Sequence, residues 1–272
     1  MKYRLFAADF DGTLYEGEMP HIPEENRKAI EEYRRRGGKF LIATGRMYRS
    51  IRPYAIDLDL KDELIAYQGA TVYDVKNSAL LLNIPIKTDQ AAEILLYIEE
   101  KGYHCQIYYN DIYYIVENND YAESYSRFCG IPINLTHIPL SEYVLKGGIE
   151  PTKMMVIMDR DKLNAFYIEL KDQFKGKYGF ARSSDNFIEI TNSRANKGVA
   201  LKFIAHRYGI RREEVAAIGD STNDLAMIEY AGLGIAVGNA MEELKKASRL
   251  VTVNAGDNAV AKVLNMIMRD EL

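Results

Sequence analysis

Side chains capable of acid–base and metal chemistry are concentrated in four short segments of this sequence. They are Asp9-Phe10-Asp11-Gly12-Thr13-Leu14, Thr44-Gly45-Arg46, the segment that begins at Lys197, and Gly219-Asp220-Ser221-Thr222-Asn223-Asp224. Three of the four follow short apolar runs, which are typical of buried strands. Because ligands of an open parallel sheet bind at the carboxyl ends of its strands, we expect the four segments to meet at one edge of such a sheet.

The acidic members of these segments predict a site for a divalent cation. Asp9, Asp11, Asp220 and Asp224 cannot all remain ionised at close range without one, because like charges disfavour one another. Oxygen ligands of this kind suit Mg2+, which keeps several of its waters and shares the oxygens of a phosphate group. We therefore expect a magnesium site that lets a phosphate dianion approach the carboxylates.

The other polar groups of the four segments could hold that phosphate. Lys197 would place a positive charge on one phosphate oxygen, and the Thr44 hydroxyl would donate a hydrogen bond to another. Backbone amides of the loop from Phe10 to Thr13 would donate further bonds, and Gly12 lets that loop turn sharply. Stabilising charge in this way is the main thing that phosphoryl transfer requires of a protein.

The two aspartates of the first segment are expected to have different roles. A carboxylate can attack phosphorus and form an aspartyl phosphate, and Asp9, at the end of its strand, would be held rigidly for this step. Asp11, two residues further on, could protonate the leaving oxygen and later deprotonate the attacking water. Separate roles explain why two carboxylates stand so close together in the sequence.

The pattern of apolar residues indicates the elements that position these segments. Helical patterns, such as the one that opens at Pro23 and ends at Gly37, separate most of the apolar runs. Runs without alternation are typical of parallel strands covered by helices on both faces. These runs are Leu5–Ala8, Phe40–Ala43, Leu64–Ala66, Val215–Ile218 and Gly234–Val237. We therefore predict an α/β fold, with a doubly wound, Rossmann-like parallel-sheet core.

The middle of the chain has paired and more polar strands. Asn110-Asp111 is a plausible two-residue turn between Ile107–Tyr109 and Ile112–Tyr114. A second hairpin is expected around Ser184-Asp185-Asn186. The four tyrosines of the first hairpin have two interpretations, packing within a sheet and stacking against a substrate.

These two patterns predict the domain organisation. A strand at Lys153–Met158 and a helix at Asp161–Phe174 complete the α+β pattern of the middle region. We expect a core formed by residues 1–84 and 190–272, into which an α+β cap of residues 85–189 is inserted.

In order, Asp9 to Leu14, Thr44, Lys197 and Gly219 to Asp224 resemble the four motifs of the haloacid dehalogenase superfamily. The long insertion between the second and third motifs is similar to the large α/β cap of the Cof-type hydrolases in that superfamily. The resemblance covers essentially the whole chain. It implies an Mg2+-dependent phosphatase that acts on a small phosphorylated metabolite, such as a sugar phosphate, a phosphorylated cofactor or its precursor.

The resemblance also implies the roles of individual residues. Asp9 would be the nucleophile and Asp11 the acid/base. The Asp9 carboxylate, the Asp11 main-chain carbonyl and the Asp220 side chain would bind Mg2+. Asn223 and Asp224 would complete or support that metal site.

Thr44 and Lys197 are expected to hold the phosphoryl group, and Arg46 could either meet the substrate or form a surface ion pair. The full set expected to bind phosphate or substrate is Phe10, Gly12, Thr13, Thr44, Gly45, Arg46 and Lys197.

Composition limits the other functions that this chain could have. The 272 residues carry a formal net charge of −4 without a long run of one sign, which argues against nucleic acid or an anionic membrane as a partner. No apolar run approaches the length of a membrane span. The N-terminal residues show no small-residue cleavage site, and the two cysteines form no C-x-x-C pair. We expect a cytoplasmic protein, and its oligomeric state stays open.

Two alternatives to a phosphatase are compatible with the motifs. A phosphomutase on the same scaffold would pass the phosphoryl group from Asp9 to a second sugar phosphate. A non-catalytic protein could bind phosphate esters without turnover, although such a protein would not need the acid/base Asp11.

Overall fold

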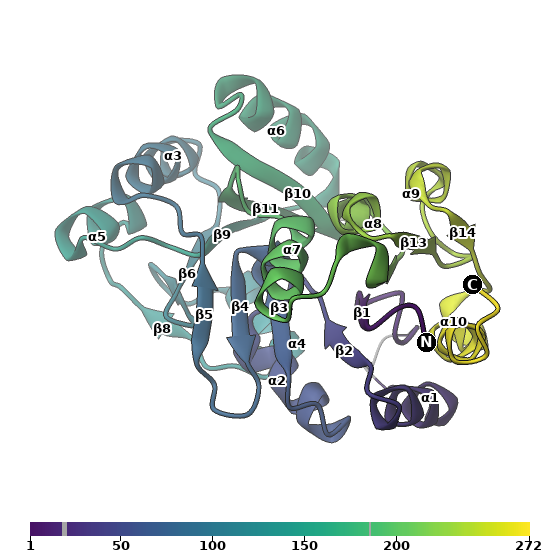
Figure 1. The fold of residues 1–272 in the computed structure, drawn as a ribbon. Helices are drawn as coiled ribbons and strands as arrows, with labels where there is room; N and C mark the ends of the chain where they lie inside the picture. The colour runs from purple at the N-terminus through teal and green to yellow at the C-terminus, as the bar shows by residue number, and fades with distance from the viewer. Residues whose placement is uncertain (18–20, 185) are drawn as a thin grey trace. The chain divides into compact units, whose positions relative to one another are not determined.

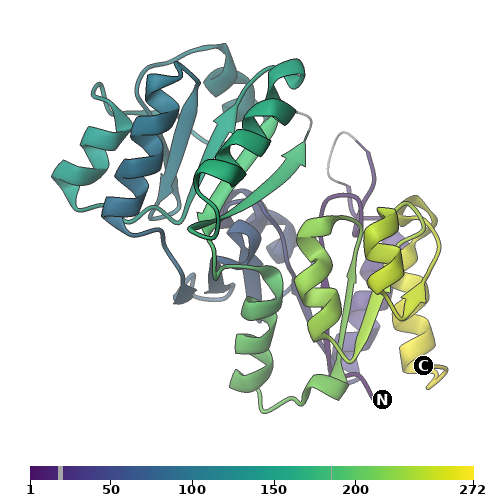
Figure 2. The ribbon, with the colours of Figure 1, turned by 90° about the horizontal axis from the view of Figure 1, so that it is seen from above.

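The computed structural model of the protein describes residues 1–17, 21–184 and 186–272. The chain divides into two compact units, whose ribbons are drawn in Figures 1 and 2. The core unit consists of Met1–Arg46, Ile51–Leu82 and Asn196–Leu272, and the inserted unit consists of Met47–Ser50 and Asn83–Ala195. The role of the inserted unit as a cap stays a prediction.

A five-stranded parallel sheet forms the centre of the core unit, with the strand order β14-β13-β12-β1-β2. Its strands are β1 (Leu5–Ala8), β2 (Lys39–Ile42), β12 (Val215–Gly219), β13 (Leu233–Ala236) and β14 (Leu250–Val251). In register, Ala8 pairs with Ile218 on one side and with Ile42 on the other. Strands β12, β1 and β2 therefore end together, and the predicted α/β class with a parallel core is confirmed.

Helices cover both faces of this sheet, which is why its strands are apolar except for Lys39 at the start of β2. Helix α1 packs against α10 and α7 packs against α8, and Figure 1 shows these pairs on opposite sides of the strands. The helices of the core unit are α1 (Glu24–Arg35), α7 (Lys197–Arg207), α8 (Leu225–Tyr230), α9 (Glu242–Ala247) and α10 (Ala259–Met268), together with most of α2 (Tyr48–Asp57), whose first residues belong to the inserted unit. Acidic residues in the first turn and arginines in the last turn favour α1.

The run at residues 64–66 differs from the prediction of a strand in the parallel sheet. It lies in β3 (Glu63–Ala66), which pairs antiparallel with β4 (Thr71–Asp74), while β5 (Leu80–Asn83) completes a separate three-stranded sheet. An isolated parallel bridge between Ala43 and Ile65 connects it with the end of β2. The short turn at Tyr67–Gly69 explains the antiparallel pairing with β4, because it reverses the chain in far fewer residues than a parallel crossover needs.

The inserted unit contains a six-stranded sheet of order β10-β11-β9-β6-β7-β8. Its strands are β6 (Cys105–Tyr109), β7 (Ile112–Ile115), β8 (Asn134–Leu135), β9 (Lys153–Ile157), β10 (Tyr178–Ser184) and β11 (Phe187–Asn192). Its helices are α3 (Thr88–Glu100), α4 (Asp120–Cys129), α5 (Leu140–Gly147) and α6 (Arg160–Gln173). Buried residues of α3, α5 and α6 form one hydrophobic cluster with alternate residues of the sheet, which gives the α+β architecture.

The predicted hairpin at Asn110-Asp111 is confirmed. Both residues have positive φ, 51° and 58°, as a two-residue hairpin turn requires, and Tyr109 pairs with Ile112 across it. Of its tyrosines, Tyr108 and Tyr113 are buried, and the other two pack against the hydrophobic cluster of the unit. Strands β10 and β11 also pair antiparallel, but Asp185 in their turn lies outside the described residues.

Candidate active site

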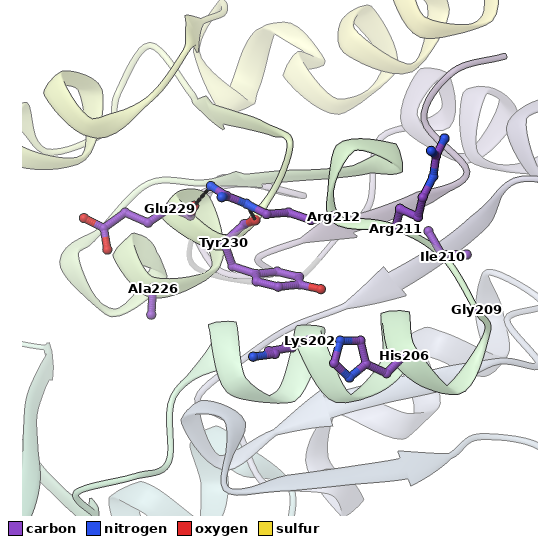
Figure 3. A pocket seen from close by; sticks show the side chains of 9 residues that line it. All are labelled: Lys202, His206, Gly209, Ile210, Arg211, Arg212, Ala226, Glu229 and Tyr230. Atoms are coloured by element: carbon purple, nitrogen blue, oxygen red, sulfur yellow. Dashed lines mark hydrogen bonds between the residues drawn. The ribbon is translucent and has the colours of Figure 1, made fainter.

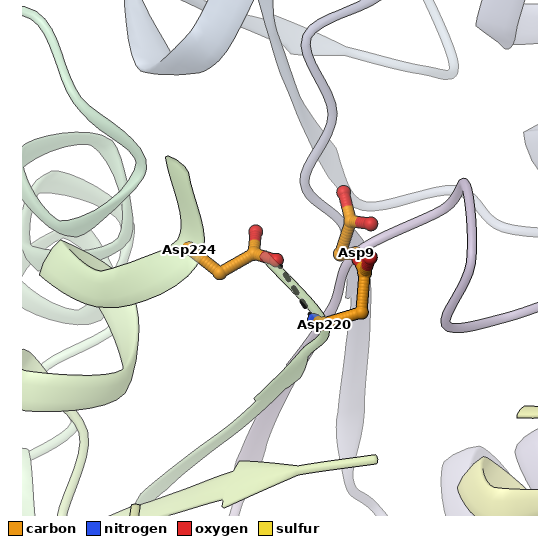
Figure 4. Close-up of side chains that lie close together, drawn as sticks. All are labelled: Asp9, Asp220 and Asp224. Atoms are coloured by element: carbon orange, nitrogen blue, oxygen red, sulfur yellow. Dashed lines mark hydrogen bonds between the residues drawn. The ribbon is translucent and has the colours of Figure 1, made fainter. Parts of the chain in front are cut away.

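Three aspartates from two sequence motifs meet at the carboxyl edge of the core sheet. Asp9 follows β1 and donates its backbone N–H to the carbonyl of Ile218, while Asp220 follows the adjacent strand β12. One carboxylate oxygen from each of Asp9, Asp220 and Asp224 lies within 4.8 Å of the other two. Figure 4 shows Asp9 and Asp220 side by side, with Asp224 directed toward them from the turn before α8. The expected convergence of these segments is therefore present.

Lys197 connects two of these carboxylates. Its ammonium donates to Asp9 Oδ1 at 2.5 Å and to Asp224 Oδ1 at 2.6 Å, and its side chain is completely buried. The position of Lys197 is set by the start of α7, where the Asn196 side chain accepts a hydrogen bond from the Val199 amide. A buried ammonium with two carboxylate partners can also attract a phosphate oxygen.

The electrostatics of the group favour an additional cation. Burial, followed by the charge of Asp224, raises the pKa of Asp9 well above its ordinary value, although Lys197 acts in the opposite direction. Burial and then the charge of Asp224 raise the pKa of Asp220 from 3.8 to about 6. Burial lowers the pKa of Lys197, but Asp224 and Asp9 outweigh burial and raise it. One ammonium thus leaves excess negative charge among three carboxylates, which a divalent cation would balance.

The loop after β12 is organised by Asp224. Its Oδ2 accepts hydrogen bonds from the backbone amides of Asp220 and Ser221, at 3.0 and 3.2 Å. The hydroxyl of Ser221 donates to Asn223 Oδ1 at 2.7 Å. Thr13 donates to Asp220 Oδ1 at 3.3 Å, which links this loop to the first motif. Both carboxylate oxygens of Asp224 therefore have hydrogen-bond partners within the protein. Asp220 accepts the bond from Thr13 and lies close to Asp9.

Glycines allow the close approach of these loops. A Cβ on Gly12, whose φ is +78°, would lie 3.0 Å from Asp220 Oδ2. A Cβ on Gly219 would lie 2.5 Å from Asp224 Oδ2. Larger residues at either position would push the carboxylates apart.

Asp11 lies in a ring of hydrogen bonds with Arg46 and Tyr15. Arg46 donates to both Asp11 oxygens, at 2.9 and 2.6 Å, and the Tyr15 hydroxyl donates to Asp11 Oδ1 at 2.7 Å. Of the two alternatives for Arg46, an ion pair is present, although the arginine side chain is only 9% exposed and is not on the surface. Sequence reasoning missed Tyr15, because its residue type and position carry no functional signal.

The second motif lies beside this ring. Thr44 is buried after the end of β2, and its hydroxyl accepts a hydrogen bond from the Arg46 amide at 3.1 Å. A Cβ on Gly45 would lie 2.2 Å from Gln68 Nε2, so the glycine makes room for that side chain. Phe10 packs against the ring of Tyr15 with its centroid 5.0 Å away, so only its backbone is suited to binding phosphate.

The sequence matches the model of the haloacid dehalogenase-like hydrolases over residues 6–264. The chain belongs to this family. It is 32% identical over 263 residues to the 5-amino-6-(5-phospho-D-ribitylamino)uracil phosphatase YcsE of Bacillus subtilis, covering 96% of this chain and 94% of YcsE. Phosphatase YwpJ of the same organism is 27% identical over 286 residues, covering 97% and 100% of the two chains. The crystal structure of TM0651 from Thermotoga maritima is 34% identical, with a TM-score of 0.84 and 97% of each chain covered.

These relatives confirm two predictions for this haloacid dehalogenase-like hydrolase. The resemblance seen in the four motifs is correct, and the chain is an enzyme of the phosphatase class. The roles of individual residues, the metal and the substrate stay predictions. None of the helices in the described ranges is long and apolar enough to cross a membrane.

A cavity of about 950 Å³ lies elsewhere in this hydrolase, between α7, α8 and the turn after α7 (Figure 3). Its lining is basic, with one acidic residue and the ring of Tyr230: Lys202, His206, Gly209, Ile210, Arg211, Arg212, Ala226, Glu229 and Tyr230. It contains none of the residues predicted for catalysis. Arg212 donates to the carbonyls of Glu229 and Tyr230 at the end of α8, so part of its charge stabilises the helix.

Proposed function

We propose that this phosphatase hydrolyses a small phosphorylated metabolite through an aspartyl phosphate on Asp9, with Mg2+ bound beside it. The observation that carries the proposal is the meeting of Asp9, Asp220 and Asp224 with a buried Lys197 at one sheet edge. Such a group combines a nucleophile, a site for a cation and a fixed positive charge, which are what phosphoryl transfer needs.

The carboxylates fit Mg2+ by their chemistry and by their charge. Asp9 and Asp220 would hold it together with the main-chain carbonyl of Asp11, because oxygen ligands suit this ion. Asp224 would act through other groups, since its oxygens already bind Lys197 and two backbone amides, and Asn223 would hold the same loop. When bound, Mg2+ would supply positive charge to the carboxylates and to the phosphate oxygens.

In the first step, an oxygen of Asp9 attacks phosphorus and the bond from phosphorus to the alcohol oxygen breaks. Asp11 gives its proton to the departing oxygen, so the alcohol leaves neutral. Lys197 and Thr44 bind oxygens of the phosphoryl group and stabilise the charge that develops on them. The product of this step is the aspartyl phosphate on Asp9.

In the second step, water attacks the phosphorus of the aspartyl phosphate. The Asp11 carboxylate takes a proton from that water, the bond from phosphorus to the Asp9 oxygen breaks, and inorganic phosphate leaves. Asp9 is then a carboxylate again and Asp11 carries the proton that the next cycle needs.

The substrate proposed is a sugar phosphate or a phosphorylated cofactor or precursor. YcsE, named for a phosphorylated ribityl-pyrimidine, makes a compound of that kind a reasonable member of the test panel. The experiment measures phosphate release from a panel of phosphomonoesters, with Mg2+ present and after its removal by a chelator. Release that is undiminished after chelation would contradict the metal part of the proposal.

A phosphomutase uses the same aspartyl phosphate, so the two activities are separated at the second step. The intermediate on Asp9 is trapped by rapid quenching, and its discharge is followed in water alone and with sugar phosphates present. Discharge to water at the rate of turnover supports a phosphatase, whereas transfer to a sugar phosphate without release of inorganic phosphate would support a mutase.

A further inference from the structure

Tyr15 lies four residues after Asp11, and the backbone between them folds back on itself. The Gly12 amide donates to the Tyr15 carbonyl at 3.1 Å, and the Tyr15 amide donates to the Phe10 carbonyl at 3.4 Å. This turn brings the Tyr15 hydroxyl to 2.7 Å from Asp11 Oδ1. The hydroxyl therefore bonds to the side chain proposed as acid/base. Among the described residues, it makes no hydrogen bond to the proposed nucleophile, Asp9.

Arg46 closes a ring of three side chains with Asp11 and Tyr15. Its Nε donates to Asp11 Oδ2 at 2.9 Å, and its Nη2 donates both to Asp11 Oδ1 at 2.6 Å and to the Tyr15 hydroxyl at 3.1 Å. Each side chain is thus bonded to the other two, and both oxygens of Asp11 are held. An arginine that bonds to both oxygens fixes the plane of a carboxylate. The tyrosine hydroxyl bonds to one of these oxygens from another position and further restricts the movement of the Asp11 side chain.

Of the three side chains that bond to one another, Tyr15 and Arg46 are buried and Asp11 is accessible. Tyr15 is 4% exposed and the Arg46 side chain 9% exposed, whereas the Asp11 side chain is 45% exposed. The ring of Tyr15 packs on Phe10 with centroids 5.0 Å apart, and Phe10 in turn packs on Tyr54 at 5.0 Å. An accessible carboxyl is therefore held from beneath by buried groups that cannot easily move.

We propose that Tyr15 is a positioning residue, which fixes the direction of the Asp11 carboxyl toward the oxygen that leaves phosphorus. This inference rests on the proposed acid/base role of Asp11. Proton transfer requires the carboxyl within hydrogen-bond reach of that oxygen, and a misplacement of about 1 Å can cost about a hundredfold in rate. The hydroxyl of Tyr15 would limit such misplacement without touching the substrate.

The proposal predicts a dependence on the leaving group. An alkyl alcohol is a poor leaving group and needs a proton as it departs, whereas p-nitrophenolate is stable enough to leave without one. The ratio kcat/KM reports steps up to the departure of the alcohol, so it isolates the acid role of Asp11 from its later role as a base. A loose Asp11 should therefore affect alkyl substrates selectively.

The test compares Tyr15→Phe with the unchanged enzyme on two substrates, in the full chain with Mg2+ present. For the best alkyl phosphomonoester of the panel we expect kcat/KM to fall about tenfold, and for p-nitrophenyl phosphate we expect it to change less than about twofold. A loss that is equal for both substrates, no loss, or a gain would overturn the proposal.

Tyr33→Phe is the matched control. Tyr33 is also buried in the core unit and its hydroxyl also makes a hydrogen bond, to the carbonyl of Tyr3 at 3.2 Å, but it lies on α1 away from the four motifs. It should leave the ratio between the two substrates unchanged. Thermal unfolding of both variants verifies that they are folded.

Asp11→Asn separates this inference from the proposed function. If that variant keeps full activity on the alkyl substrate, the acid role of Asp11 is wrong and the proposed function fails at that point. If it loses alkyl turnover while Tyr15→Phe behaves like the unchanged enzyme, only the positioning role of Tyr15 fails.

Discussion

Each unit of the chain contains a lysine with almost no exposed surface, but the two lysines have different surroundings. In the core unit, Lys197 donates to Asp9 and Asp224 at 2.5 and 2.6 Å. In the inserted unit, Lys153 of β9 pairs with Glu189 of β11 at 3.1 Å, and both side chains are at most 5% exposed. Burial of a charged side chain is therefore common to both sites.

The balance of charge distinguishes them. Lys153 and Glu189 form a pair of one positive and one negative charge, which compensates itself. Around Lys197 there are three carboxylates, and burial with mutual repulsion raises the pKa values of two of them, Asp9 and Asp220. A buried ion pair alone is weak support for function, whereas an unbalanced group of carboxylates supports the cation site proposed above.

The largest effect is expected for Asp9→Asn. Loss of the nucleophile should reduce phosphate release at least about a thousandfold. The protein should remain folded, because an amide removes one of three carboxylates that repel one another. Steady-state phosphate release measures the first effect and thermal unfolding without Mg2+ the second. Substantial turnover by a folded variant would show that another group attacks phosphorus.

Replacing each lysine with methionine compares the two sites directly. Lys197→Met should reduce kcat/KM about a hundredfold, because the phosphoryl group loses a fixed positive charge. Lys153→Met should change kcat/KM for p-nitrophenyl phosphate less than about threefold, yet should lower the free energy of unfolding by about 3–5 kcal/mol, since it removes the ammonium 3.1 Å from the buried Glu189 carboxylate. Equal losses of activity in both variants would remove the distinction between the sites.

Removing the acidic partner as well sharpens this comparison. Lys153→Met combined with Glu189→Leu should recover most of the lost stability, because no buried charge then remains in the pair. Lys197→Met combined with Asp224→Leu should not recover activity, because Asp9 still lacks the ammonium of Lys197. Urea unfolding measures the free energies of unfolding of Lys153→Met and of its double variant, and phosphate release measures the activity of the Lys197 variants. Recovery of activity by the Lys197 double variant, equal to the recovery of stability by the Lys153 double variant, would contradict the prediction.

Addition of Mg2+ should stabilise the protein through the core unit alone. A ligand at a hundred times its dissociation constant adds about 2.7 kcal/mol to the free energy of unfolding, so the melting temperature should rise as Mg2+ is titrated. Asp220→Asn should remove most of that rise, whereas Glu189→Gln should retain it. An undiminished rise in the Asp220 variant would place the metal elsewhere.

The sequence was sufficient to predict the meeting of the motifs. The strands before Asp9, Thr44 and Asp220 are short, continuous apolar runs, and a parallel sheet brings the ends of such strands to one edge. The hairpin at Asn110-Asp111 could also be predicted from the sequence, because a two-residue turn with positive φ favours those residue types. Both features depend on local patterns that the sequence displays directly.

Other features depend on contacts that have no local signal. The apolar run before Tyr67 looks the same whether it pairs parallel or antiparallel, so its pairing with β4 was missed. The pair of Lys153 and Glu189 arises from the alignment of β9 with β11, and neither residue is unusual by itself. The hydrogen bond of Tyr15 to Asp11 likewise follows from how the loop closes. Sequence reasoning located the motifs but not the groups that hold them.

The smallest effect concerns pH in the absence of Mg2+. The folded-state pKa of Asp220 is raised from 3.8 to about 6, mainly by burial, so the folded protein binds this proton more tightly than the unfolded chain does. The resulting stabilisation is fully present below pH 3.8 and is lost as the pH rises through about 6. Asp220→Asn does not bind this proton, so its melting temperature, relative to that of the unchanged protein, should increase between pH 3.8 and about 6. Comparing the two proteins at the same pH cancels the contributions of all other groups. With saturating Mg2+ at neutral pH, the unchanged protein should have the higher melting temperature of the two. The ion binds the ionised carboxylate of Asp220, and the amide of the variant cannot replace it. A difference between the two melting temperatures that stays constant from pH 4 to 7 would show that Asp220 does not have the raised pKa on which the charge imbalance partly depends.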